Sequence, residues 1–115
     1  MKLSNAAARL PWHSDYPLTT NDVAAIVAAD LPEVRAARVT ALGDGWDFAT
    51  YLVDDTWVFR FPKRRQCVRP LAREIKQLEV LAEALTGAEI ATPRYRFHVL
   101  KPTTFALPYG GYPML

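Results

Sequence analysis

The sequence predicts an α+β domain in which a five-stranded antiparallel sheet packs against one long helix, with a shorter helix ahead of the sheet. Three observations support this fold class. Short stretches rich in aromatic and β-branched residues are separated by tight glycine or aspartate turns, as in antiparallel hairpins. A later stretch repeats its apolar residues at helical spacing. The chain has 115 residues, which is enough for one domain with a single core.

The first part of the chain predicts an irregular arm followed by a short helix. Residues 1–18 have no clear period and contain two prolines, so we divide the chain into an arm, 1–18, and a lobe, 19–115. Thr19 and Asp22 have the spacing of a capping box, in which a hydroxyl and a carboxylate three residues later cap a helix. The alanine-rich run behind them predicts a helix that ends near Asp30, because a proline two residues later disfavours helical backbone before it.

Five segments predict strands, and glycine, aspartate or proline residues separate them. Gly43 and Gly45 permit the backbone angles of a tight turn between the first two strands. Asp54 and Asp55 predict the turn between the second and third strands. The expected strands are 38–42, 48–53, 56–61, 94–100 and 109–115.

The third strand has two chemically different faces. Alternation with period two places Trp57, Phe59 and Phe61 on one face. Val58 and Arg60 lie on the other face. One face is therefore entirely aromatic, and the other pairs an aliphatic residue with a cation.

The main helix is expected over residues 70–85, with Pro70 in its first turn and Gly87 as its C-cap. Successive helical residues are about 100° apart, which places Glu74 inside the apolar stripe. A carboxylate on a core-facing stripe needs a partner, because burying it unpaired is costly. The apolar residues of the stripe recur at intervals of four, three, four and three: Leu71, Ile75, Leu78, Ala82 and Leu85.

Composition narrows the choice of partners and compartment. Hydrophobic residues make up 50% of the chain, which is typical of a globular domain. Lys and Arg number 14 against 12 Asp and Glu, so the net charge of +2 gives little support to an anionic partner. No apolar run is long enough to cross a membrane. The single cysteine, Cys67, cannot form an intrachain disulfide, and we expect a cytoplasmic protein.

A glycine turn, a strand cation and a helix carboxylate follow one another in the order of the upper half of a kinase-type nucleotide clamp. Backbone N–H groups at Gly43 and Gly45 could lie over phosphates, although two glycines also fit an ordinary hairpin. The Arg60 guanidinium can hold phosphate oxygens with two N–H groups, and Val58 on the same face suits a nucleobase. Glu74 would pair with Arg60 and fix its rotamer. The alternatives are a structural arginine at the sheet edge and a surface carboxylate.

This layout resembles the N-terminal lobe of the aminoglycoside phosphotransferase family, which includes macrolide phosphotransferases and has a protein-kinase-like fold. The resemblance runs from about Leu18 to the end of the chain. Its most specific part is the Phe-Arg-Phe-Pro-Lys-Arg segment at 59–64. It also depends on residues 45–48, on Glu74 with the leucines that follow it, on Thr92 and Pro93, and on residues 109–115.

The resemblance implies transfer of the γ-phosphoryl group of ATP or GTP to a hydroxyl of a small molecule, either an aminoglycoside, a macrolide or a related metabolite. It implies that Arg60 contacts the phosphates and that residues 112–115 form the hinge beside the nucleobase, which adds Tyr112, Met114 and Leu115 to the site. The family's catalytic His-x-Asp loop and its Mg²⁺ ligands belong to a C-terminal lobe. We therefore expect this chain by itself to be inactive, with an exposed apolar surface around Val58, Tyr112 and Met114.

The main alternative is a small basic nucleic-acid-binding module. Lys63, Arg64 and Arg65 form a basic run that Arg69 and Arg73 extend, and such a patch beside aromatic residues can bind RNA or single-stranded DNA. The aromatic residues lie in strands that need a core, so we expect this function less than nucleotide binding. His13 and His98 lack the spacing of a metal site, and we expect no metal ligands in this chain.

Overall fold

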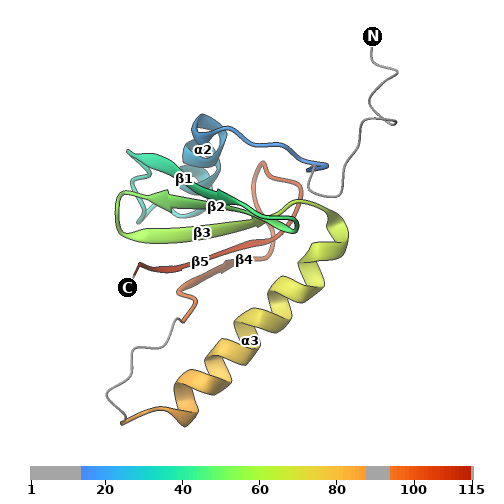
Figure 1. Ribbon diagram of the computed structural model, residues 1–115. Coiled ribbons are helices and arrows are strands. Elements are labelled where there is room, and N and C mark those ends of the chain that lie inside the picture. Colours follow the sequence, from blue (N-terminus) through green and yellow to red (C-terminus); the bar gives the residue numbers. More distant parts are fainter. Residues whose placement is uncertain (1–13, 88–93, 115) are drawn as a thin grey trace.

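The computed structural model describes residues 14–87 and 94–114, and it confirms the predicted fold class (Figure 1). The five strands form one sheet in the order β1-β2-β3-β5-β4, and every neighbouring pair is antiparallel. In chain order the elements are α2 (Thr20–Asp30), β1 (Val39–Asp44), β2 (Phe48–Val53), β3 (Trp57–Pro62), the 3₁₀ turn η1 (Arg65–Cys67), α3 (Val68–Ala84), β4 (Phe97–Val99) and β5 (Tyr109–Pro113). No helix within the described ranges is long and apolar enough to cross a membrane.

The short helix α2 begins at the predicted cap. The Thr19 side chain accepts the N–H of Asp22, and the Asp22 carboxylate accepts the N–H of Thr19, at 3.1 and 2.9 Å. Residues 14–18 lie outside helices and strands, and Tyr16 and Leu18 pack against the core of the domain. The division into an arm and a lobe stays a prediction, because residues 1–13 lie outside the described part.

The core lies between α2 and the aromatic face of β3. Phe59 and Phe61 are almost completely buried, at 0% and 1% exposure, as the alternation predicted. They pack with buried residues of α2, β2, β4, β5 and the loop before β5: Val23, Val27, Tyr51, Phe97, Phe105 and Tyr109. The aromatic rings of Phe61 and Tyr109 stack at 4.5 Å between centroids. This layer covers one face of the sheet and leaves the face of Arg60 to α3.

Helix α3 runs away from the sheet, so only its first part is packed (Figure 1). Leu71 is 1% exposed, whereas Ile75, Leu78, Ala82 and Leu85 are only partly buried. The helix begins at Val68, two residues earlier than expected, and Pro70 still lies in its first turn. Gly87 has a φ of 95°, but it lies two residues beyond the C-cap Leu85 rather than at the cap itself.

The structure corrects the predicted glycine turn. Gly43 lies in β1, where it pairs with Thr50, and a register irregularity between Ala41 and Gly43 accommodates Leu42. Neither Gly43 nor Gly45 has a positive φ, because the bulge lets the ladder continue to Asp44 without a left-handed residue. The two aspartates of the next turn adopt that conformation instead, each with a φ of 54°.

Two other strands are shorter than expected. β4 spans Phe97–Val99 within the predicted 94–100, and it lies at the edge of the sheet with β5 as its one neighbour. β5 ends at Pro113, and a proline cannot donate an N–H to a further ladder bond. Leu115 and residues 88–93, which include Thr92 and Pro93, lie outside the described residues.

Asp54 holds the segment before β1 against the turn between β2 and β3. Its carboxylate accepts the N–H groups of Ala36, Ala37 and Arg38 at 2.8, 2.7 and 2.9 Å. Ala36 has a φ of 55°, a conformation that costs energy for alanine, and the carboxylate compensates for it. Partial burial opposes ionisation, but these three N–H donors outweigh it and lower the pKa of Asp54.

We expect Asp54→Asn to lower stability by about 1 kcal/mol near neutral pH, because hydrogen bonds to a charged acceptor are lost. Asparagine tolerates a positive φ, so the change isolates the charge. A lowered folded-state pKa stabilises the fold above the unfolded value of about 4, and this contribution disappears as the pH falls through the folded value. Urea unfolding of both proteins from pH 7 to pH 3 should show the difference shrinking with acidity. A difference in unfolding free energy that stays constant with pH would contradict this assignment to the Asp54 charge. Asp55→Asn, in the same turn, serves as the control.

Candidate functional site

The predicted ion pair between β3 and α3 is present. Nη1 of Arg60 donates a hydrogen bond to Oε2 of Glu74, and the two side chains are 23% and 35% exposed. Strand alternation turns Arg60 away from the aromatic core, and the helical stripe turns Glu74 toward the sheet. The ion pair is therefore half-buried, and its two side chains are held by different elements, β3 and α3.

Tyr95 is a third member of this cluster that could not be predicted from the sequence. Its hydroxyl donates to Oε2 of Glu74 at 2.6 Å, the same oxygen that accepts from Arg60. Burial raises the pKa of the Tyr95 hydroxyl, and the adjacent carboxylate raises it further, so the group stays a neutral donor. Tyr95 precedes the short strand β4, and no periodicity or motif in the sequence indicated that it would meet α3.

Phe48 lies under the cation. The guanidinium carbon of Arg60 is 4.3 Å from the centroid of the Phe48 ring, within the range of a cation–π interaction. Burial alone would disfavour the charge, but the hydrogen bond to Glu74 raises the pKa of Arg60. Arg60 is thus a permanent cation with a fixed orientation. The sequence places Phe48 at the start of the second strand but does not indicate that its ring lies against Arg60.

Gly110 makes the close packing around the ion pair geometrically feasible. It pairs with Arg60 across β3 and β5. A Cβ atom at this position would lie 2.8 Å from the ring of Tyr95 and 3.3 Å from Ile75. The Tyr95 ring also packs edge to face with Tyr112, at 5.1 Å between centroids. A side chain at residue 110 would push Tyr95 away from Glu74.

The expected nucleobase residues share the face of Arg60 but differ in exposure. Val58 pairs with Leu52 on one side and Tyr112 on the other. It is 5% exposed, so the prediction of an exposed surface at Val58 was wrong, because these neighbours and the strands around it cover it. Tyr112 is half-buried, and Met114 is 51% exposed, which agrees with the expected exposed apolar surface at this position. The Met114 N–H donates to the carbonyl of Thr56 at 2.8 Å.

The β1–β2 hairpin reaches the site through the sheet register. Thr50 pairs with Arg60 on one side and with Gly43 on the other, so these residues lie in one row across the sheet. Gly43 and Gly45 are both exposed, and the Gly45 N–H donates to the carbonyl of Phe48 at 3.0 Å. This row places the hairpin alongside the Arg60–Glu74 pair. Contact between the two glycines and a phosphate stays a prediction.

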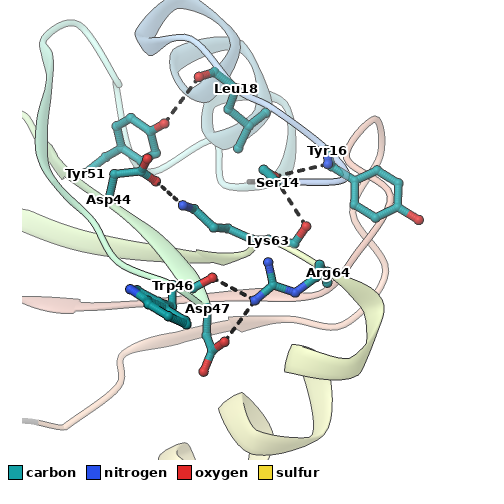
Figure 2. A network of polar contacts seen from close by, with 9 residues as sticks. All are labelled: Ser14, Tyr16, Leu18, Asp44, Trp46, Asp47, Tyr51, Lys63 and Arg64. Carbon is teal, nitrogen blue, oxygen red and sulfur yellow. Dashed lines mark hydrogen bonds and ion pairs between the residues drawn. The ribbon is translucent and has the colours of Figure 1, made fainter. Parts of the chain in front are cut away.

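The basic run after β3 is not a free charged patch (Figure 2). The Lys63 side chain is 2% exposed and its Nζ lies 2.6 Å from Oδ1 of Asp44. Nη2 of Arg64 donates to the carbonyl of Trp46 at 2.7 Å and to Oδ1 of Asp47 at 3.0 Å. Two of the three cations proposed for nucleic-acid binding are thus engaged with the β1–β2 hairpin.

The described residues fit a nucleotide better than a metal ion. A fixed cation, neighbouring exposed backbone and an apolar strand face suit phosphates and a base. In residues 14–87 and 94–114, no group of three or more His, Cys, Asp or Glu side chains could hold a metal ion.

The fold is similar to the N-terminal lobe of kinase-like aminoglycoside phosphotransferases. A GDP complex of wild-type aminoglycoside 2'-phosphotransferase-IIIa is similar with a TM-score of 0.70 and 26% identity over 84% of this chain. A GDP and kanamycin complex of APH(2")-IIia is similar with a TM-score of 0.65 and 27% identity over 80%. A gentamicin complex of APH(2")-IIa, with a TM-score of 0.53 and 14% identity over 86% of this chain, supports the fold alone.

The similarity covers only part of those proteins. This chain spans 31%, 29% and 29% of the three chains, in the same order. No protein-family model and no curated protein sequence matches it. The resemblance seen in the sequence is thus supported by three-dimensional structure, for one lobe.

Proposed function

We propose that this chain is the nucleotide-binding lobe of a phosphotransferase, and that Arg60 holds the phosphates of ATP or GTP. The observation that carries the proposal is the Arg60–Glu74 pair, which is half-buried on the sheet face away from the aromatic core. The similarity to two GDP-bound aminoglycoside phosphotransferases supports the same ligand class.

The chemistry of the cluster suits phosphate binding. A guanidinium has five N–H donors, and the hydrogen bond to Glu74 uses Nη1, so further donors remain to bind phosphate oxygens. Glu74 and Phe48 fix the cation from two sides, and Tyr95 in turn holds the Glu74 carboxylate. Such preorganisation lowers the entropy cost of binding. The exposed backbone at Gly43 and Gly45 would lie close to the phosphates, with the Gly45 N–H already bonded to the carbonyl of Phe48. Val58, Tyr112, Met114 and Leu115 would contact the base.

For the whole phosphotransferase, we propose transfer of the γ-phosphoryl group to a hydroxyl of a small molecule. The similar structures include a complex with GDP and kanamycin, which supports an aminoglycoside acceptor over a macrolide or another metabolite. Mg²⁺ would neutralise phosphate charge when bound, with ligands outside the described residues. The lobe itself would position the nucleotide, and we expect it to transfer no phosphate by itself.

Titration with nucleotide and with nucleic acid separates the proposal from its alternative. We expect Mg·GTP or Mg·ATP to bind weakly to the 115-residue chain, because a single lobe would contact the nucleotide from one side only. A single-stranded oligonucleotide should bind less well at each salt concentration. Oligonucleotide binding that falls steeply with salt, depends on Lys63, Arg64 and Arg65 together, and ignores Arg60 would overturn the proposal. NMR chemical shifts or calorimetry provide the measurement.

A further inference from the structure

The connector between β3 and α3 is tied to the β1–β2 hairpin by a backbone hydrogen bond and by side-chain contacts, and Figure 2 shows the side-chain contacts. The Lys63 N–H donates to the carbonyl of Asp47 at 2.9 Å, and its Nζ lies 2.6 Å from Asp44. Asp44 is the last residue of β1, and Asp47 immediately precedes β2. One residue therefore holds both ends of the hairpin tip.

The same residue is anchored to the arm. The Lys63 carbonyl accepts the N–H of Asp15 at 2.9 Å and the Ser14 hydroxyl at 3.3 Å. The Ser14 hydroxyl in turn accepts the N–H of Tyr16 at 3.1 Å. Hairpin, connector and arm thus converge on Lys63, which directly follows the strand that carries Arg60.

The exposure of the two charged partners is very unequal. The Lys63 side chain is 2% exposed, and the Asp44 side chain is 71% exposed. A buried ammonium is costly unless a carboxylate pairs with it. The buried Lys63 ammonium therefore needs the ion pair more than the exposed Asp44 carboxylate does. Because Lys63 is held in place, the ion pair restrains Asp44 and the hairpin that carries it.

Lys63 lies on the opposite side of the sheet from the proposed phosphate site. It has the same alternation as Phe59 and Phe61, and it lines a cavity of about 420 Å³ together with Leu18, Tyr51 and Phe61. Arg60 points to the other face, toward Glu74. A nucleotide held by Arg60 would consequently not contact the Lys63 ammonium.

We propose that Lys63, through its ion pair with Asp44, is a positioning residue that holds the β1–β2 hairpin in place for nucleotide binding. The proposal rests on the proposed nucleotide site. Lys63 acts through the hairpin and not by touching the ligand. The hairpin tip, residues 44–47, has solvent-exposed side chains, so these tethers replace the core packing that normally restrains a loop.

Asp44→Asn tests the proposal because electrostatics alone predicts the opposite result. Removing a negative charge near a phosphate site should strengthen nucleotide binding. If the hairpin needs the restraint, the affinity for Mg·GTP or Mg·ATP should instead fall about tenfold, because order in the binding loop is lost. Amide exchange at Gly45 and Lys63 should accelerate about tenfold, while exchange in α2 stays unchanged.

Two further variants complete the experiment on the full chain. Lys63→Met keeps an aliphatic chain in the buried position and should reproduce the affinity loss, and the double variant should be no worse than either single one. Asp55→Asn removes an exposed carboxylate in the β2–β3 turn, 63% exposed and paired with Arg38, and should change nothing.

The outcomes separate this proposal from the one on which it rests. If the wild-type chain binds neither nucleotide, the nucleotide site is wrong and the positioning role falls with it. If the wild type binds but Asp44→Asn binds equally or more tightly, only the positioning role is overturned. Unchanged amide exchange at the hairpin in Asp44→Asn also overturns it.

Discussion

Arg60→Ala is expected to reduce the affinity for Mg·GTP and Mg·ATP at least about 100-fold, which corresponds to about 2.7 kcal/mol. The change removes the cation proposed to hold the phosphates. It also leaves the carboxylate of Glu74 on the same face, where it would repel a phosphate. Calorimetry or an NMR titration of wild type and variant measures the effect.

A graded series identifies the role of each group in this cluster. Glu74→Gln should weaken binding less than Arg60→Ala, because it releases the arginine rotamer without deleting a phosphate contact. Arg38→Ala removes an arginine whose side chain is 72% exposed and paired only at the surface with Asp55, and should leave the affinity unchanged. Equal effects of Arg38→Ala and Arg60→Ala would mean that net charge alone governs binding, which contradicts the assigned site.

Gly111→Ala should be the most destabilising single-methyl change in the described sheet. Gly111 pairs with Phe59 on one side and Phe97 on the other, and the two rings stack above it at 5.8 Å between centroids. A Cβ at Gly111 would lie 2.5, 2.6 and 2.9 Å from atoms of the Phe59 ring. Phe59 is completely buried, at 0% exposure, so the ring cannot move aside without disturbing the core.

We expect Gly111→Ala to cost about 3 kcal/mol of unfolding free energy through overpacking and to lower the Tm by roughly 10 °C or more. Gly43→Ala is a matched control, because Gly43 also lies in a strand and an added Cβ there meets no atom within 4 Å. Urea and thermal unfolding should show Gly43→Ala within about 0.5 kcal/mol of wild type. Similar losses in both variants would disprove the packing explanation.

The pairing of Arg60 with Glu74 could be predicted because it depends on two local periodicities. Alternation in β3 sends Arg60 to the face opposite Phe59. Helical spacing in α3 places Glu74 in the apolar stripe. Each periodicity can be recognised from a few consecutive residues. An unpaired buried charge is costly, so Arg60 on the strand and Glu74 on the helix could be expected to pair with each other.

Tyr95, Phe48 and Gly110 complete the cluster, and their roles could not be predicted in this way. Tyr95 meets Glu74 across 21 positions of the sequence, and Gly110 matters because the ring of Tyr95 passes where a Cβ would be. The contacts of Tyr95 and Gly110 depend on β5 lying between β3 and β4, whereas Phe48 meets Arg60 from the neighbouring strand β2. No local pattern encodes that strand order, so no local pattern indicates the contacts that follow from it.

Local sequence patterns were enough to predict the classes of element, the two faces of β3 and the charged pair of the proposed site, because backbone geometry dictates the side-chain direction within a strand or helix. Which charges are buried depends instead on the packing of distant segments. The sequence places Lys63 in a basic run that could bind nucleic acid, yet its side chain is 2% exposed and paired with Asp44. Burial is a property of everything packed around a residue, and for Lys63 those neighbours come from the arm, the hairpin and β2, which only folding brings together.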